Sequence, residues 1–146
     1  MNKMQQQVTE FHKKYRHCAR TTPGLPGTTE LKLRNDLINE EYEEYSDAVN
    51  DRDIVKIADA LADLLYVTLG TCVSFGIDIE PIFDIVHKAN MLKSFEKAQT
   101  GKTVKGDEWK HPTEAIQLEL QRQEKIKRKP PAVGGHFPPP GGYNNL

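Results

Sequence analysis

Signals for β-strands are nearly absent from this sequence. It contains no Asn-Gly or Asp-Gly hairpin dipeptide and no sustained alternation of apolar and polar residues. Segments with the period of an amphipathic helix are frequent instead. The length of 146 residues favours one domain, and a hydrophobic content of 37% suffices for one helical core. We therefore predict an all-α fold, a helical bundle of about four to five helices.

A strong net charge, paired cysteines and a long uncharged run are also missing. A net charge of −1 argues against a general polyanion binder, so no nucleic-acid partner is expected. Cys18 and Cys72 lie far apart, which indicates inert thiols in a reducing compartment. The longest uncharged stretch, Leu64 to Ile77, is shorter than the roughly 18–20 apolar residues of a membrane span. The first residues lack the apolar core of a secretion signal, so we expect a cytoplasmic protein without membrane association.

Helix breakers and caps divide the chain. Asp53 and Asp78 are predicted N-caps, with Pro81 in the first turn after Asp78. The segment 129–146 contains five of the nine prolines and four of the ten glycines, which predicts a flexible tail. We predict a main domain at 1–112, a C-terminal helix at 113–128 and the tail at 129–146. The predicted helices cover about 2–19, 29–50, 53–76, 78–98 and 113–127, and 100–112 is predicted to be an irregular loop.

The second predicted helix carries glutamates where an apolar seam is expected. One narrow face of this helix, which we call the stripe, has the spacing of a buried apolar seam, yet Glu41 and Glu44 occupy positions where leucine is expected. Glu40 lies beside the same face. A solvated acidic face remains the simpler alternative, and Glu43 and Asp47 fit it. The stripe consists of Leu33, Leu37, Glu41, Glu44 and Ala48.

The third predicted helix carries a sharper anomaly. From Ile54 to Ile77 the only charged residues are Lys56, Asp59 and Asp63, and such an apolar helix is expected to be buried. Removing a lone carboxylate from water costs several kcal/mol. The two aspartates lie one helical turn apart, and we therefore expect cations to neutralise their negative charge.

A hard divalent ion is the simplest source of that positive charge. Oxygen ligands suit Mg²⁺, with Mn²⁺ as a possible substitute, and such an ion keeps waters for phosphate oxygens. Because the connection at 51–53 is short, the two helices are expected to pack antiparallel, with Glu41 and Glu44 facing Asp63 and Asp59. A network of these acids with Lys and Arg remains the alternative. On the fourth helix, Asn90 and Lys93 share a face that could meet phosphate.

Four ordered motifs carry a family resemblance. They are Glu40-Glu41-x-x-Glu44, DALADLLY at 59–66, VHKANMLKS at 86–94 and GKTVKGDEW at 101–109. Together they resemble the all-α nucleotide pyrophosphohydrolases, most closely the MazG-like and phosphoribosyl-ATP pyrophosphohydrolase-like proteins, over about residues 8–112.

The resemblance implies Mg²⁺-dependent cleavage of a nucleoside triphosphate between its α and β phosphates. It also implies a bundle completed by oligomerisation, as a homodimer or homotetramer. Glu40, Glu41, Glu44 and Asp63 match metal-site positions of the family. Asn90 and Lys93 match positions associated with substrate phosphate, and Lys105 lies in the matching Gly-Lys-x-x-Lys-Gly loop.

One departure from the family pattern concerns the third helix. The glutamate expected three residues before Asp63 is Ala60 here, and Asp59 is the residue that could replace it. We assign Glu41, Glu44 and Asp63 to Mg²⁺, with Asp59 sharing a metal or positioning water. Glu40 is the candidate for orienting or deprotonating the attacking water.

Several alternatives stay open at this point. The favoured role is house-cleaning or control of the deoxynucleotide pool, and phosphoribosyl-ATP is the alternative substrate within the class. A di-iron carboxylate oxidoreductase is less favoured, since it requires Glu-x-x-His on two helices and the chain offers one Asp84-x-x-His87. A non-catalytic helical oligomer that binds a protein partner is the remaining alternative. Against it stands the expectation that Asp59 and Asp63 are buried rather than exposed.

Overall fold

The computed structural model describes residues 1–94, 101–107 and 109–126. These residues form five α-helices and include no β-strand, which confirms the predicted all-α class. The predicted tail at 129–146 lies outside the described residues. The helices are α1 (Lys3–Lys14), α2 (Thr28–Asp51), α3 (Ile54–Phe75), α4 (Ile79–Met91) and α5 (Thr113–Lys125).

Local signals set the ends of α3 and the start of α4 as predicted. The side chain of Asp53 accepts hydrogen bonds from the backbone N–H groups of Val55 and Lys56. Gly76 ends α3 with a φ of 70°, and an added Cβ there would lie 2.1 Å from the carbonyl oxygen of Thr22. Only glycine fits this turn, because its φ and its close backbone neighbour both exclude a side chain.

Two helices are shorter than predicted. Helix α1 ends at Lys14 rather than near residue 19, because Arg16 adopts a φ of 58° that turns the chain back. Helix α4 ends at Met91 rather than near residue 98. After it the backbone N–H of Ser94 donates to the carbonyl of Val104, so the chain has already turned towards the following loop. In both cases a local turn outweighs helical periodicity.

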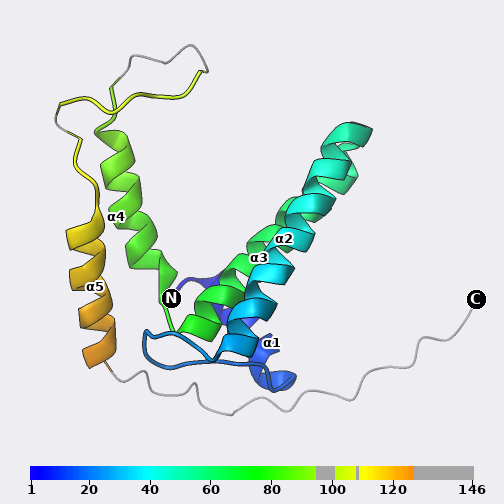
Figure 1. Cartoon of the computed structure of the whole chain (residues 1–146), viewed down its shortest axis with the longest axis horizontal. Helices are drawn as coiled ribbons and strands as arrows, with labels where there is room; N and C mark the ends of the chain where they lie inside the picture. Colours follow the sequence, from blue (N-terminus) through cyan, green and yellow to red (C-terminus); the bar gives the residue numbers. More distant parts are fainter. Residues whose placement is uncertain (95–100, 108, 127–146) are drawn as a thin grey trace, which may run out of the picture.

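The helices form two arms that diverge from a shared base (Figure 1). One arm is the antiparallel hairpin of α2 and α3, with α1 packed on α3; the other is α4 beside α5. The small core lies at the base, where Val8 of α1 packs with Leu69 and Val73 of α3, and Ile79 covers them. The tip of α4 therefore lies away from the far end of the hairpin (Figure 1).

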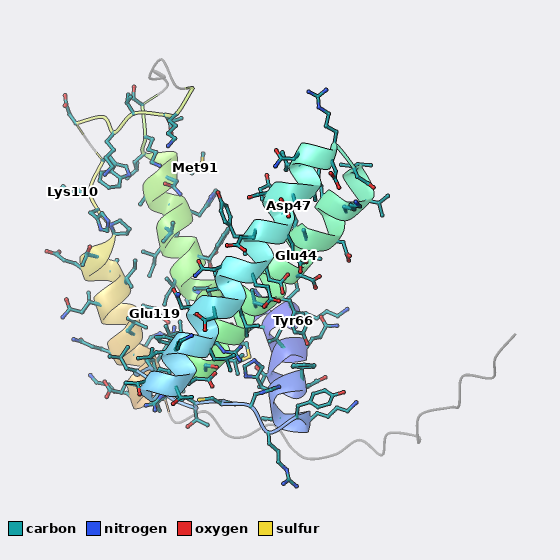
Figure 2. All side chains as sticks on the ribbon, turned by 45° about the vertical axis from the view of Figure 1, so that its right-hand side comes forward. Glu44, Asp47, Tyr66, Met91, Lys110 and Glu119 are labelled. Carbon is teal, nitrogen blue, oxygen red and sulfur yellow. The ribbon has the colours of Figure 1, made fainter. Side chains whose placement is uncertain are left out.

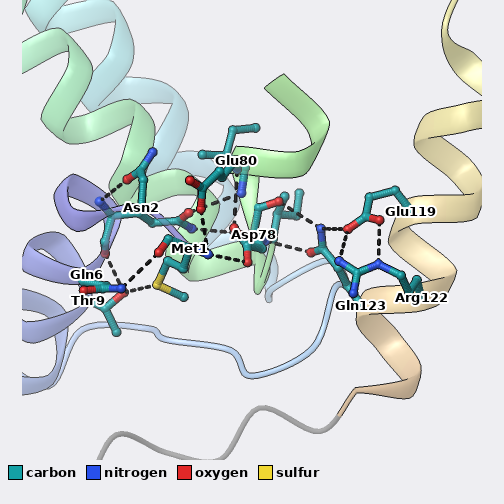
Figure 3. Close-up of polar contacts among 12 residues, drawn as sticks. Met1, Asn2, Gln6, Thr9, Asp78, Glu80, Glu119, Arg122 and Gln123 are labelled. Carbon is teal, nitrogen blue, oxygen red and sulfur yellow. Dashed lines mark hydrogen bonds and ion pairs between the residues drawn. The ribbon is translucent and has the colours of Figure 1, made fainter. Parts of the chain in front are cut away.

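Two buried glutamines fix the turn between α3 and α4. Gln5 donates to the carbonyl of Ile77 and accepts from the N–H of Ile79. Gln123 of α5 accepts from the N–H of Asp78 and donates to its carbonyl. Figure 3 shows Gln123 reaching Asp78 from α5 while the Met1 ammonium approaches the same aspartate from the other side. These amide contacts set the angle at which the second arm leaves the first.

Helix α3 is not buried on all sides, contrary to the expectation from its composition. Ile54 and Val55 are 74% and 75% exposed, and Leu61 and Leu65 are also exposed. The reason is that α1 and α2 cover only two faces of this helix within one chain. Among the described residues α3 alone is long and apolar enough to cross a membrane, judged by length and composition. The expectation that no segment spans a membrane considered only stretches without any charge. The core helix of a globular protein also meets the criterion of length and composition.

Candidate functional site

The face of α2 that packs on α3 follows a seven-residue repeat. Arg34 is 6% exposed and Ala48 is buried, while Glu41 between them is half-buried. The predicted stripe is wrong at two positions, because Leu33 is 40% exposed and Glu44 is exposed. Seven residues correspond to nearly two full turns, so positions 34, 41 and 48 face α3 together.

Glu41 is under the charges of carboxylates from both helices. Burial, together with the charges of Glu44, Asp63 and Glu40, raises the pKa of the Glu41 carboxyl. Asp63 belongs to α3 and the others to α2, so the hairpin brings the two acidic motifs together as the short connection predicted. Figure 2 shows Glu44 on α2, on the part of the helix that runs beside α3. We call Glu40, Glu41, Glu44 and Asp63 the carboxylate cluster.

The carboxylate cluster is more exposed than expected. Only Glu41 is half-buried, and Asp59 and Asp63 are both exposed in this chain. The expectation that these aspartates are removed from water is therefore wrong for a single chain. The argument that their burial speaks against a partner-binding surface is wrong for the same reason. The physical reason is that α1 and α2 cover only two faces of α3, which leaves both aspartate side chains in contact with water.

The cluster is nevertheless without a protein counter-charge among the described residues. The ion pairs found there involve other acids, among them Glu30, Asp36 and Asp51. The alternative network of these acids with Lys and Arg is thus not found in that part of the chain. Nor do three or more His, Cys, Asp or Glu side chains of the described residues already form a metal site. The cluster has the charge and the oxygen donors for a hard cation without a closed cage.

Asp59 occupies a different position from the cluster. It is exposed and is not among the charges that shift Glu41. Ala60, where the family pattern has glutamate, is buried. The suggestion that Asp59 takes over the role of that glutamate remains a prediction.

Below the cluster lies a buried polar group that sequence reasoning missed. The Nε atom of Arg34 lies 2.9 Å from Oε1 of Glu30, an ion pair whose direction does not form a hydrogen bond. Ser74 of α3 donates to the same Glu30 oxygen over 2.7 Å. The spacing could have identified Arg34 as part of this seam, because it precedes Glu41 by seven residues and therefore lies on the same face of α2.

His12 of α1 completes this buried group. Its Nδ1 lies 2.7 Å from the carbonyl oxygen of Cys18, which fixes Nδ1 as the donor and leaves Nε2 without a proton. Burial lowers the pKa of His12, and the nearby charge of Arg34 lowers it further. Gly70 lies between the two, since an added Cβ would be 3.0 Å from both Nε2 of His12 and Nη1 of Arg34.

The residues assigned to phosphate form a second group at the tip of α4. Asn90 is in its last turn and Lys93 lies just past its end, and the Ser94–Val104 hydrogen bond brings the loop with Lys105 to the same end. Lys105 holds its Nζ 4.0 Å above the ring of Trp109. Figures 1 and 2 show that α4 diverges from the hairpin, so one chain does not bring this group to the carboxylate cluster.

The two cysteines are free, as expected from their spacing. Burial raises the pKa of the Cys72 thiol, which keeps it protonated and unreactive. Neither thiol takes part in the carboxylate cluster.

The chain is all-α in its described residues and carries acidic side chains on both helices of the α2–α3 hairpin. Residues 8–90, more than half of the chain, match the phosphoribosyl-ATP pyrophosphohydrolase family, and the chain belongs to that family. Members of that family are pyrophosphohydrolases, which act on phosphoric anhydrides. The matched segment contains the whole carboxylate cluster and Asn90.

A viral protein is similar to a larger part of the chain. Over 98 residues the chain is 40% identical to uncharacterized protein L479 of Acanthamoeba polyphaga mimivirus. The similarity covers 63% of this chain and 36% of that protein, so the chain spans about a third of the length of its relative.

Proposed function

We propose that the protein hydrolyses nucleoside triphosphates between the α and β phosphates, with Mg²⁺ as the cofactor. The products are a nucleoside or deoxynucleoside monophosphate and pyrophosphate. The proposed role is house-cleaning of nucleotides or control of the deoxynucleotide pool. The observation that supports this most directly is the carboxylate cluster, because burial and three acids of two helices raise the pKa of Glu41 and the cluster has no basic partner among the described residues.

The donor set of the cluster fits Mg²⁺. All donors are carboxylate oxygens, which hard divalent cations prefer, and the open geometry suits an ion that retains waters and binds phosphate oxygens. Glu41, Glu44 and Asp63 would hold it, with Asp59 as a further candidate. When bound, the ion would offset the negative charge of the phosphates.

The remaining steps are assigned to side chains. Glu40 orients a water molecule and takes its proton as the water oxygen attacks the α-phosphorus. The bond from the α-phosphorus to the bridging oxygen breaks, and pyrophosphate leaves with the electron pair. Asn90, Lys93 and Lys105 hold the phosphates, since an amide and two ammonium groups donate hydrogen bonds to their oxygens.

A second copy of the chain is needed to bring these groups together. The phosphate-binding residues lie at the tip of α4, away from the cluster of the same chain (Figure 1). The exposed apolar residues Ile54, Val55, Leu61 and Leu65 of α3 offer a surface on which a second copy would pack. We propose a homodimer or homotetramer in which α4 of one copy approaches the cluster of another.

Release of pyrophosphate is the direct test of the reaction. The assay uses the common ribo- and deoxynucleoside triphosphates, dUTP and phosphoribosyl-ATP, each with Mg²⁺ and with excess EDTA. We expect release that EDTA abolishes, and the ranking of substrates identifies the nucleotide pool. Release that persists in EDTA, or none from any substrate, contradicts the proposal.

A matched pair of variants tests the assignment of the cluster. Glu41→Gln should lower pyrophosphate release at least 100-fold, because it removes a charged ligand. Glu43→Gln changes an exposed glutamate of the same helix and should leave the rate within about two-fold. Both should retain the helical circular-dichroism signal. Equal rates for Glu41→Gln and the wild type would overturn the assignment.

Phosphoribosyl-ATP is the second candidate substrate. The family matched over residues 8–90 takes its name from this reaction. It uses the same bond cleavage, since phosphoribosyl-ATP also carries an α–β phosphate anhydride. Pyrophosphate release from this compound alone would assign the protein to it.

A further inference from the structure

Four aromatic rings form an exposed cluster that the proposed mechanism does not use. Phe11 is at its centre, with ring centroids 4.7 Å from Tyr15, 5.7 Å from His17 and 5.7 Å from Tyr66. Phe11, Tyr15 and Tyr66 are each more than a third exposed, and His17 is exposed as well. Because these rings contact one another while remaining accessible, they offer faces to a flat ligand. We call Phe11, Tyr15, His17 and Tyr66 the aromatic platform.

An unusual turn builds the platform. Arg16 has a φ of 58°, a conformation that residues other than glycine rarely adopt and that is often found at functional sites. The turn allows the N–H of His17 to donate to the carbonyl of His12 over 2.8 Å. It thereby places the His17 ring on that of Phe11, with only 21° between the two ring planes.

The platform is continuous with the carboxylate cluster. Tyr66 follows Asp63 by three residues on α3, which is about 4.5 Å along the helix axis. Figure 2 shows Tyr66 on α3 beside α1, the helix that carries Phe11 and is followed by Tyr15 and His17. A nucleotide with its phosphates at Asp63 and Glu41 therefore has aromatic faces within one helical turn, where its base can lie.

We propose that the aromatic platform binds the nucleobase of the substrate, with the base stacked on the ring of His17 and in edge contact with the steeply inclined ring of Tyr66. This inference rests on the proposed function, since it requires the phosphates to be at the carboxylate cluster. Every base has an aromatic face, so stacking tolerates different bases. The substrate class is accordingly nucleotides with any of several bases, and their KM values should differ by no more than about ten-fold.

Steady-state kinetics of two platform variants test the proposal. With the preferred nucleotide and Mg²⁺, His17→Ala and Tyr66→Ala should each raise KM about ten-fold and change kcat less than two-fold. This follows from the stabilisation that one stacked base provides. Tyr42→Ala removes an exposed tyrosine of α2 outside the platform and should leave both constants unchanged. Tyr66→Phe should retain the wild-type KM, because it keeps the ring.

Further measurements separate the possible failures. Unchanged KM in both alanine variants overturns the platform, and so does a change of molar mass in light scattering, which would assign the rings to a subunit interface. If Tyr66→Ala does not fold, the exposed His17 variant decides. If the wild type releases no pyrophosphate, the proposed function fails. In that case the affinity for α,β-methylene-ATP in the presence of Mg²⁺ is measured for the wild type and for His17→Ala. Equal affinities, or no binding by either protein, overturn the platform.

Discussion

The two ends of the seam between α2 and α3 differ in whether their acidic side chains have partners within the protein. At the base, Glu30 has both Arg34 and Ser74 as neighbours, and these three side chains are largely buried. About three turns farther along α2, Glu41 is under the charges of Glu40, Glu44 and Asp63, and this cluster has no basic partner among the described residues. The first arrangement is complete within the protein. The second leaves negative charge that an external cation can neutralise, so the same pair of helices serves both stability and binding.

The largest expected effect comes from breaking the buried pair at the base. Arg34→Ala leaves Glu30 without its cation, and removing one partner of such a pair costs about 3 kcal/mol of unfolding free energy. Urea unfolding followed by circular dichroism measures this loss. Lys32→Ala breaks the exposed pair with Asp36 and should cost less than about 0.5 kcal/mol. Equal losses in the two variants would contradict the distinction between buried and exposed pairs.

Filling the space between His12 and Arg34 should have the next largest effect. Gly70→Ala places a Cβ 3.0 Å from each of these side chains, and overpacking should outweigh the better helix propensity of alanine. We expect a net loss of about 1–2 kcal/mol in thermal or urea unfolding. Gly27→Ala is the control, since a Cβ there meets no atom within 4 Å. A more stable Gly70→Ala protein would show that the seam has room.

The buried histidine should make stability depend on pH. Because the folded-state pKa of His12 is below its ordinary value of 6.5, the unfolded chain binds more protons in the interval between the two values. The contribution is fully present above about pH 6.5 and is lost as the pH falls towards the folded-state pKa. Unfolding free energies measured from pH 5 to pH 7.5 should rise with pH. The rise should be smaller in His12→Gln, and parallel curves would contradict the role of His12.

The smallest effect is expected at the carboxylate cluster without metal. The pKa of Glu41 is raised on folding, so its contribution to stability is present below pH 4.5 and is lost as the pH rises through the folded-state value. At pH 7 Glu41→Gln should therefore stabilise the metal-free protein, by about 0.2–0.5 kcal/mol for each like-charge pair relieved. The same variant should lose any stabilisation by Mg²⁺. Melting temperatures with EDTA and with Mg²⁺ measure both, and Glu43→Gln serves as the control.

Much of the site could be predicted because its signals are local. The glutamates of α2 and Asp63 of α3 stood out as charges within helical patterns, and the short 51–53 connection required the helices to be antiparallel. Their burial could not be predicted, because it depends on which faces of α3 other helices cover. Arg34 was missed for a related reason: its burial requires α1 and the end of α3, both far from it in sequence.

The sequence by itself determined which segments are helical, the caps at Asp53 and Asp78 and the end of α3 near Gly76. Each of these follows from interactions between residues a few positions apart. Only the tertiary structure decided that α4 leaves the hairpin and that Phe11, His17 and Tyr66 meet. The buried amides of Gln5 and Gln123 at the α3–α4 turn belong to the same set. These depend on contacts across many residues, which no local pattern of charge or hydrophobicity specifies.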